Sequence, residues 1–135
     1  MPAMTSAAEL TGRTLLALLF VAEALSKLSA YGAAAHYMTA FGVPGQLLPL
    51  AIAVELGGGL LILVGWHTRI AAVALAGFCV AAAVLFHTTF ADRNQLLHFE
   101  KDLALAGAFL ILAARGAGSL SLDAMQARRA VAASG

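Results

Sequence analysis

The stretch Gln46–Val64, QLLPLAIAVELGGGLLILV, decides the fold of this chain. It is almost entirely apolar and carries one charged side chain, Glu55, close to its middle. An α-helix needs about 20 mainly apolar residues to cross the hydrocarbon core of a bilayer. The stretch therefore predicts a transmembrane helix, with a carboxyl group too deep in the membrane to reach water.

The whole chain shares the composition of this stretch. Of its 135 residues, 61% are hydrophobic and 11% are charged, whereas soluble domains are about 45–50% apolar and about 25% charged. A chain this short cannot bury so much apolar surface in a water-soluble core. The net charge of +1 and the lack of a basic stretch argue against nucleic acid as a partner. We therefore predict an all-α integral membrane protein embedded in a lipid bilayer.

Three further segments are long and apolar enough to span, and Gly-rich or polar turns separate them. The four predicted spans cover about residues 12–28, 46–64, 70–90 and 96–114. Between the first two lies Tyr31–Phe41, which is too short to cross and predicts a short interfacial helix that Gly42 ends. The predicted fold is a four-helix transmembrane bundle over residues 1–118. A polar tail follows at residues 119–135, and we expect its end to be mobile from Gln126 onward.

Lysine and arginine residues near the span ends predict the orientation of the bundle. One side has Arg93 as its only clear loop charge. The other side carries five arginines: Arg13, Arg69, Arg115, Arg128 and Arg129. Because cytoplasmic loops are the more basic ones, we predict a multi-pass protein of the cell inner membrane with both termini and the tail in the cytoplasm.

Several ionisable side chains fall within or at the ends of the predicted spans. Such a group near the centre of a span costs at least about 2.5–3.5 kcal/mol, so it usually faces the bundle interior and has a partner. Residues three or four apart share one face of a helix, which groups Glu23 with Lys27 in the first span. The same spacing groups part of the fourth span. The full set is Glu23, Lys27, Glu55, His87, His98, Lys101 and Asp102.

The predicted topology brings this set to a similar depth, in the outer half of the membrane. Two interpretations stay open at this point. The set forms either a neutralising network that fixes helix register, or a polar pocket that binds a ligand or handles protons. Two lysines do not balance three carboxylates, so we expect one acid to be protonated or one histidine to be charged.

Two other types of site receive little support from the sequence. His87 and His98 together with an acid could ligate zinc or iron, but no segment has a recognised ligand spacing and the nearby lysines repel cations. We therefore predict no metal site. Cys79 lies in an apolar run and is expected to be a small buried hydrophobic residue.

Several short pieces of sequence together resemble the DoxX family of small four-helix membrane proteins. The pieces follow one another along nearly the whole chain. They are Ala24-Leu25-Ser26-Lys27-Leu28, Glu55-x-Gly57-Gly58 with Gly65, Thr68-Arg69-x-Ala71-Ala72, His87, His98-Phe99-x-Lys101 and Leu120-Ser121-Leu122-Asp123-Ala124. The chain departs from the family pattern at Glu23 and Ala24, and at Asp102, where many members have Asn. The acids at 23 and 102 add acidity to the same predicted pocket.

The resemblance implies a four-helix bundle, and relatives in the family are described as membrane components of oxidoreductase or stress-response complexes. We accordingly expect a membrane subunit that binds a small redox ligand, most plausibly a quinone, with Glu55, His98 and Lys101 as the principal residues. Glu23, Lys27, His87 and Asp102 are expected around the ligand. The chain has no flavin, dinucleotide or haem fingerprint, so electrons would come from an oxidoreductase partner subunit.

Two alternatives to this function remain. The first is a non-enzymatic membrane assembly or scaffold factor, in which the charged set only stabilises the bundle. The second is a small-molecule transporter, which would need a homo-oligomer because four spans are few for that role.

Overall fold

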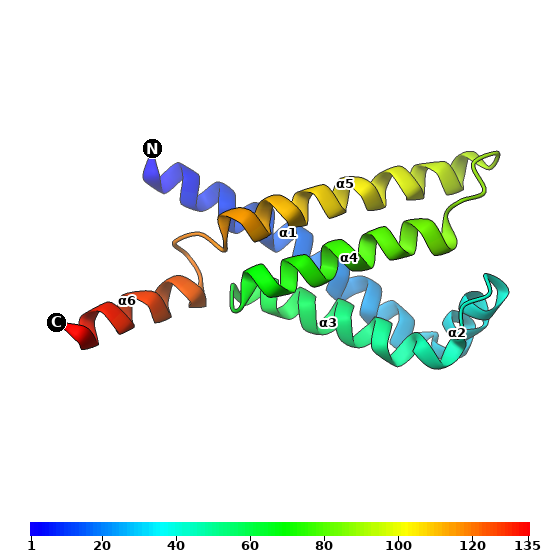
Figure 1. The fold of residues 1–135 in the computed structure, drawn as a ribbon, viewed down its shortest axis with the longest axis horizontal. Helices are drawn as coiled ribbons and strands as arrows, with labels where there is room; N and C mark the ends of the chain where they lie inside the picture. The colour runs from blue at the N-terminus through cyan, green and yellow to red at the C-terminus, as the bar shows by residue number, and fades with distance from the viewer.

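The computed structural model describes residues 1–135, and its regular elements are all helices (Figure 1). In chain order they are α1 (Pro2–Ser29), α2 (Tyr31–Ala40), the short 3-10 helix η1 (Gly45–Leu47), α3 (Leu48–Val64), α4 (Thr68–Phe86), α5 (Arg93–Arg115) and α6 (Leu122–Ser134). The longest helices, α1, α3, α4 and α5, correspond to the four predicted spans. The predicted all-α fold is confirmed.

The long helices form two pairs that join along one seam. Helix α1 packs along α3, α4 packs along α5, and contacts between α3 and α4 connect the pairs. Figure 1 shows both termini at one end of the bundle, and α2 with the α4–α5 connection at the opposite end. The termini therefore lie on the same side of a bilayer that the bundle crosses.

Two segments, Gly45–Val64 and Thr68–Phe86, are each long and apolar enough to cross a membrane. Helices α1 and α2 meet the same criterion together, as a pair bent by 98°. Helix α5 does not meet it, because Glu100, Lys101 and Asp102 place three consecutive charges in its N-terminal half. The crossing of α5 thus stays a prediction that rests on its packing along α4.

Two helix ends differ from the predicted spans for local reasons. Helix α1 begins at Pro2 rather than near residue 12, because Ala, Met, Glu and Leu before Gly12 favour helix and a proline fits the first turn. Helix α4 ends at Phe86 rather than at residue 90. His87 already leaves helical geometry there, as the residue that caps the helix.

The short interfacial helix was predicted over Tyr31–Phe41, and the structure has α2 in this place. Gly42 follows it with φ of +77°, a conformation that glycine adopts without strain and that stops the helix. The 98° bend between α1 and α2 is the direction expected for a helix lying along a membrane that α1 crosses.

The tail is more regular than expected. The structure has α6 continuing to Ser134, and the mobility expected from Gln126 onward stays a prediction. The side chain of Ser121 accepts a hydrogen bond from the backbone N–H of Ala124 at 3.1 Å and so caps α6. Alanine, the best helix former, is abundant in this segment and explains the continuation.

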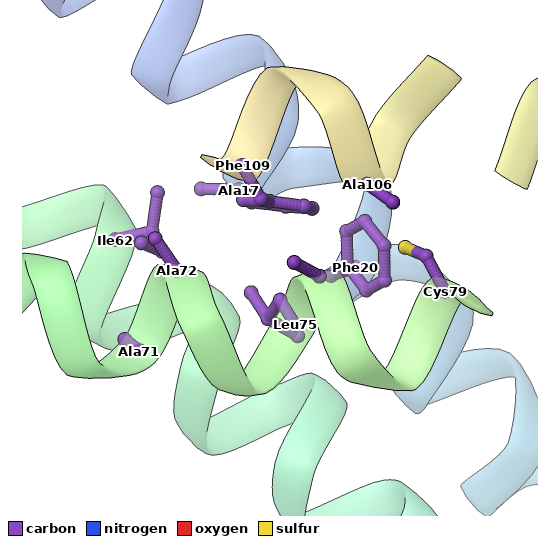
Figure 2. Packing of buried hydrophobic residues seen from close by; sticks show 10 residues of the cluster. Ala17, Phe20, Ile62, Ala71, Ala72, Leu75, Cys79, Ala106 and Phe109 are labelled. Carbon is purple, nitrogen blue, oxygen red and sulfur yellow. The ribbon is translucent and has the colours of Figure 1, made fainter. Parts of the chain in front are cut away.

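The main apolar core lies where all four long helices meet (Figure 2). Phe20 of α1 packs edge-on against Phe109 of α5, with ring centroids 5.2 Å apart. Alanines fill most other positions, and such small residues allow membrane helices to approach closely. The cluster contains Ala17, Phe20, Ile62, Ala71, Ala72, Leu75, Ala76, Cys79, Ala106 and Phe109. Cys79 is thus buried, as predicted.

The outer surface of the bundle is apolar. Only 22 of the 135 residues are buried, and many large aliphatic side chains point outward from the long helices. Examples are Leu15, Leu18, Leu25, Leu50, Ile70, Val73, Val80, Leu103, Leu110 and Ile111. Soluble monomers rarely expose apolar surface on this scale. The apolar outer surface therefore fits a lipid environment.

Two glycines of α3 bring the neighbouring helices close. A Cβ atom at Gly59 would lie 3.1 Å from a methyl group of Val21 and 3.3 Å from the backbone oxygen of Ala17 on α1. A Cβ atom at Gly58 would meet Leu75 of α4 at 3.0 Å. Gly57 has open space around it. The packing is therefore within the bundle at two of the three positions.

A buried arginine, Arg13, holds the segment after α5 against the end of the bundle where both termini lie. Arg13 of α1 is 3% exposed. Its guanidinium donates to the backbone oxygen of Ala117, and to that of Leu120 at 2.8 Å. The arginine expected near the membrane boundary therefore points into the protein and holds the tail.

Asp123 also links this segment to the bundle, by capping α4. Its carboxylate accepts hydrogen bonds from the backbone N–H groups of His67 at 2.8 Å and Thr68 at 3.0 Å. Helix α4 has no capping side chain of its own. Burial acts to raise the pKa of Asp123, but these hydrogen bonds outweigh it and hold the pKa below its ordinary value.

We predict that Gly59→Ala destabilises the bundle by about 1–3 kcal/mol, because the new methyl group meets backbone atoms of α1 that cannot move alone. Gly57→Ala is the matched control and should change the stability by less than about 0.5 kcal/mol. Equilibrium unfolding in detergent micelles measures both. Equal effects of the two substitutions would contradict the close approach of α1 and α3.

We predict that Asp123→Asn destabilises the protein by about 1 kcal/mol near neutral pH, because the amide keeps one of the two acceptor oxygens and loses the negative charge at the start of α4. Because the pKa of Asp123 is lowered in the folded state, its stabilising contribution is present above the unfolded pKa and is lost as pH falls through the folded value. The difference in Tm between wild type and variant should therefore shrink below about pH 4. A difference that stays constant from pH 7 to pH 3 would refute this role.

Candidate functional site

The structure places all the predicted site residues around one cavity of about 540 Å³. The cavity lies toward the end of the bundle that carries α2, between the α1–α3 pair and the α4–α5 pair. Its volume falls within the range of small-molecule sites, about 300–1,000 Å³. The charged and imidazole side chains that line it are Glu23, Lys27, Glu55, His87, His98, Lys101 and Asp102.

On the α1–α3 side, one lysine binds two carboxylates. The Nζ atom of Lys27 lies 3.0 Å and 2.9 Å from the two carboxylate oxygens of Glu55. It also lies 3.6 Å from Glu23, one turn earlier on α1. The side chain of Glu55 is 4% exposed and that of Glu23 is 55% exposed. The pair Lys27–Glu55 is therefore the buried contact, and it ties α1 to α3.

On the α4–α5 side, a histidine and a carboxylate face each other. The Nε2 atom of His87 lies 3.7 Å from a carboxylate oxygen of Asp102. The Nδ1 atom of the same ring lies 3.0 Å from the amide oxygen of Gln95. Both ring nitrogens thus point at oxygen atoms, and the 3.7 Å contact with Asp102 is at ion-pair distance and not a hydrogen bond.

His98 and Lys101 complete this side of the cavity. The Nδ1 atom of His98 lies 2.8 Å from the backbone oxygen of Asn94, which can only accept. Nδ1 must therefore carry the proton, and Nε2 of the neutral ring is free to accept one. The ammonium group of Lys101 has no hydrogen bond or ion pair within the chain. It is the one charged group of the set without a protein partner.

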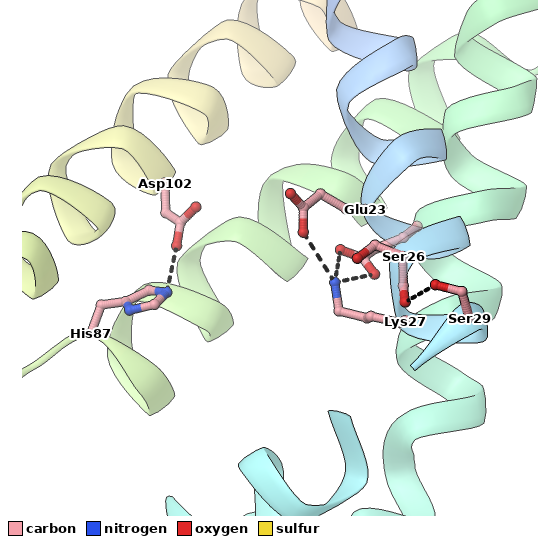
Figure 3. Close-up of polar contacts among 7 residues, drawn as sticks. Glu23, Ser26, Lys27, Ser29, His87 and Asp102 are labelled. Carbon is pink, nitrogen blue, oxygen red and sulfur yellow. Dashed lines mark hydrogen bonds and ion pairs between the residues drawn. The ribbon is translucent and has the colours of Figure 1, made fainter. Parts of the chain in front are cut away.

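Figure 3 shows these two groups of side chains on opposite walls, with Glu23 and Lys27 facing Asp102 and His87 across a gap. With both acids ionised, the α1–α3 wall carries one negative charge in excess. The α4–α5 wall combines one lysine and one acid with two titratable histidines. The sequence predicted this clustering in one region, and the ion pairs that divide it into two walls come from the structure.

The rest of the cavity is apolar. Of its 25 lining residues, 18 are hydrophobic. Tyr37 of α2 lies over Phe86 at the end of α4, with ring centroids 5.6 Å apart, and Phe41 contacts both rings. Helix α2 therefore supplies an aromatic wall next to the polar groups.

Two features of this site, Gln95 and the aromatic wall, were not predicted from the sequence. Gln95 was not selected, although it lies three residues before His98 on the same face of α5 and orients His87. The aromatic wall was missed because Tyr37 and Phe86 lie far apart in sequence and meet only through the bend between α1 and α2. No group of three histidine, cysteine or acidic side chains is arranged to hold a metal ion.

The fold and this cavity define a small helical membrane protein with ionisable groups facing one another inside its bundle. The family model of DoxX matches residues 8–88. The chain is 45% identical to inner membrane protein YqjF of Escherichia coli (strain K12), over 84% of this chain and 88% of that protein. It is 33% identical to inner membrane protein YphA of the same organism, over 84% and 86% of the two chains. The chain therefore belongs to the DoxX family.

The relatives also agree with the membrane environment, since both are named as inner membrane proteins. No solved structure matches the chain. The fold described above thus rests on the helices and contacts of this protein alone.

We predict that Lys27→Met destabilises the bundle by about 3 kcal/mol, because it leaves the Glu55 carboxylate buried without its partner. The figure is at the lower end for buried pairs since Lys27 is itself 27% exposed. The double variant Lys27→Met/Glu55→Gln should regain most of that stability. Unfolding of the three proteins in detergent micelles measures the coupling; additive losses would show that the pair is not coupled.

Proposed function

We propose that this DoxX-family protein is a membrane subunit that binds a quinone in the cavity between its two helix pairs and works with an oxidoreductase partner. The observation that carries the proposal is the unpaired Lys101 in a largely apolar cavity, opposite the Lys27–Glu55 pair. A quinone head group has a flat apolar ring with an oxygen acceptor on each side. The cavity offers apolar walls for the ring and cations on both sides for the oxygens.

The chemistry of the walls suits this ligand. Reduction of a quinone to a quinol takes up two electrons and two protons. The electrons would come from the partner subunit, since this chain has no redox group of its own in its sequence. Protons can be held at Nε2 of His87 against Asp102, and at Nε2 of His98. Lys27, held in place by Glu55, and Lys101 would position the two oxygens.

A second candidate function, a non-enzymatic assembly factor, is favoured by one contact. The pair Lys27–Glu55 is complete without any ligand and joins two helices. A non-enzymatic assembly factor would use the charged set in this way, to fix the register of the bundle. This alternative predicts loss of stability on substitution with no ligand present.

Quinone content tests the proposal. The protein is purified from its native membrane in mild detergent, and the quinone in its lipid extract is quantified per chain. We expect about one quinone per chain in the wild type, and at least about a tenfold loss in Lys101→Met and Glu55→Gln, because each removes a charged hydrogen-bonding group. Glu100→Gln is the matched control, since Glu100 is exposed on the same helix and does not line the cavity.

Two results would contradict quinone binding. One is a wild-type extract with no more quinone per chain than an unrelated membrane protein prepared in the same way. The other is an equal quinone content in Lys101→Met and Glu100→Gln. A fall in thermal stability of the cavity variants, with no quinone in any sample, would favour the assembly factor.

A further inference from the structure

A second cavity, of about 720 Å³, lies at the opposite end of the bundle from the first. It is formed where the start of α4, the end of α5 and the start of α6 meet. Only 4 of its 14 lining residues are hydrophobic, in contrast to the first cavity. Three arginines line it: Arg69, Arg115 and Arg128.

The three arginines of this second cavity outnumber the acids beside it, which are Asp123 in its lining and Glu9 of α1, packed against Gly118. None of its three arginines forms an ion pair; every ion pair of the chain lies around the first cavity. Asp123 is the one acid that lines it. Its carboxylate is already engaged by the backbone of His67 and Thr68 at the start of α4.

The three guanidinium groups differ in the hydrogen bonds that they make within the protein. Arg69 donates to the backbone oxygens of Ala113 at 2.8 Å and Ala114 at 2.5 Å, and so caps the C-terminal end of α5. Arg115 makes no side-chain hydrogen bond, and Arg128 makes one long contact of 3.4 Å to the backbone oxygen of Ser119. Two arginines are therefore available to a ligand beside a third that is fixed.

The surroundings of this cavity are those of a membrane boundary. Trp66 precedes it directly in the turn between α3 and α4 and is 40% exposed, and tryptophan favours the depth of lipid head groups. Ile70, which lines the cavity, is 73% exposed on the apolar outer side of α4. An anion at this place would have arginines on one side and acyl chains on the other.

We propose that this cavity binds a phosphate group, with Arg115 and Arg128 as its ligands and Arg69 as a fixed positive charge behind them. Arginine guanidinium groups match phosphate geometry through paired N–H donors. Two sources share this chemistry, the head group of an anionic phospholipid and free phosphate. The site is separate from the quinone cavity and does not depend on it.

Lipid retention in nanodiscs separates the two sources. The full chain is reconstituted in discs of phosphatidylglycerol mixed with phosphatidylcholine, and the lipids bound to the released protein are counted by native mass spectrometry. We expect preferential retention of phosphatidylglycerol, reduced about tenfold or more in the double variant Arg115→Gln/Arg128→Gln. A parallel sample in pure phosphatidylcholine receives inorganic phosphate, and stabilisation by phosphate there would assign the site to the soluble ion.

Arg129→Gln is the matched control. Arg129 adjoins Arg128 on α6 but does not line the cavity, so the variant should retain phosphatidylglycerol like the wild type. The variant Arg115→Lys/Arg128→Lys keeps the charges but loses the paired donors, so it should recover part of the retention, which shows that the double Gln variant fails at the site and not through its fold. Equal retention in the double Gln variant and Arg129→Gln, with no effect of inorganic phosphate on either, would overturn the proposal.

Discussion

The contact on which the rest of the structure depends is the ion pair between Lys27 and Glu55. Glu55 sits near the middle of the most apolar helix, and its side chain is only 4% exposed. A partner from another helix is therefore required, and Lys27 of α1 supplies it at 2.9 Å. This requirement fixes the rotation of α1 and α3 about their axes. Once these faces are set, the glycines of α3 allow the two helices to close.

The second helix pair, α4 and α5, also has a polar contact between its helices, but here a histidine faces a carboxylate. Helices α4 and α5 share an apolar core with α1, in which Phe20 packs against Phe109. Toward the α2 end, His87 and Asp102 face each other instead. The ion pairs form within each helix pair and not between the two pairs, so the two walls do not need to meet. A cavity remains between them.

The sequence allowed most of this arrangement to be anticipated. Hydropathy located the helices, and helical spacing grouped Glu23 with Lys27 and His98 with Asp102 on single faces. It could not show which charges pair across helices, since contact between α1 and α3 depends on rotation that no local pattern records. It also could not show that Asp123 caps the start of α4, because this carboxylate comes from a distant segment of the chain. The aromatic wall could not be predicted either, because Tyr37 and Phe86 meet only through the bend between α1 and α2.

The central claim is that one face of α5 lines a water- or ligand-accessible cavity within the membrane. Cysteine-scanning accessibility tests it directly, in a Cys79→Ala background with single cysteines along α5 and a charged methanethiosulfonate reagent added to intact membranes. The account predicts reaction at positions 98, 101, 102 and 105, which line the cavity, and protection at position 103, whose leucine faces outward. Reaction that falls smoothly with depth on every face of α5, or that favours position 103 over 102 and 105, would contradict it.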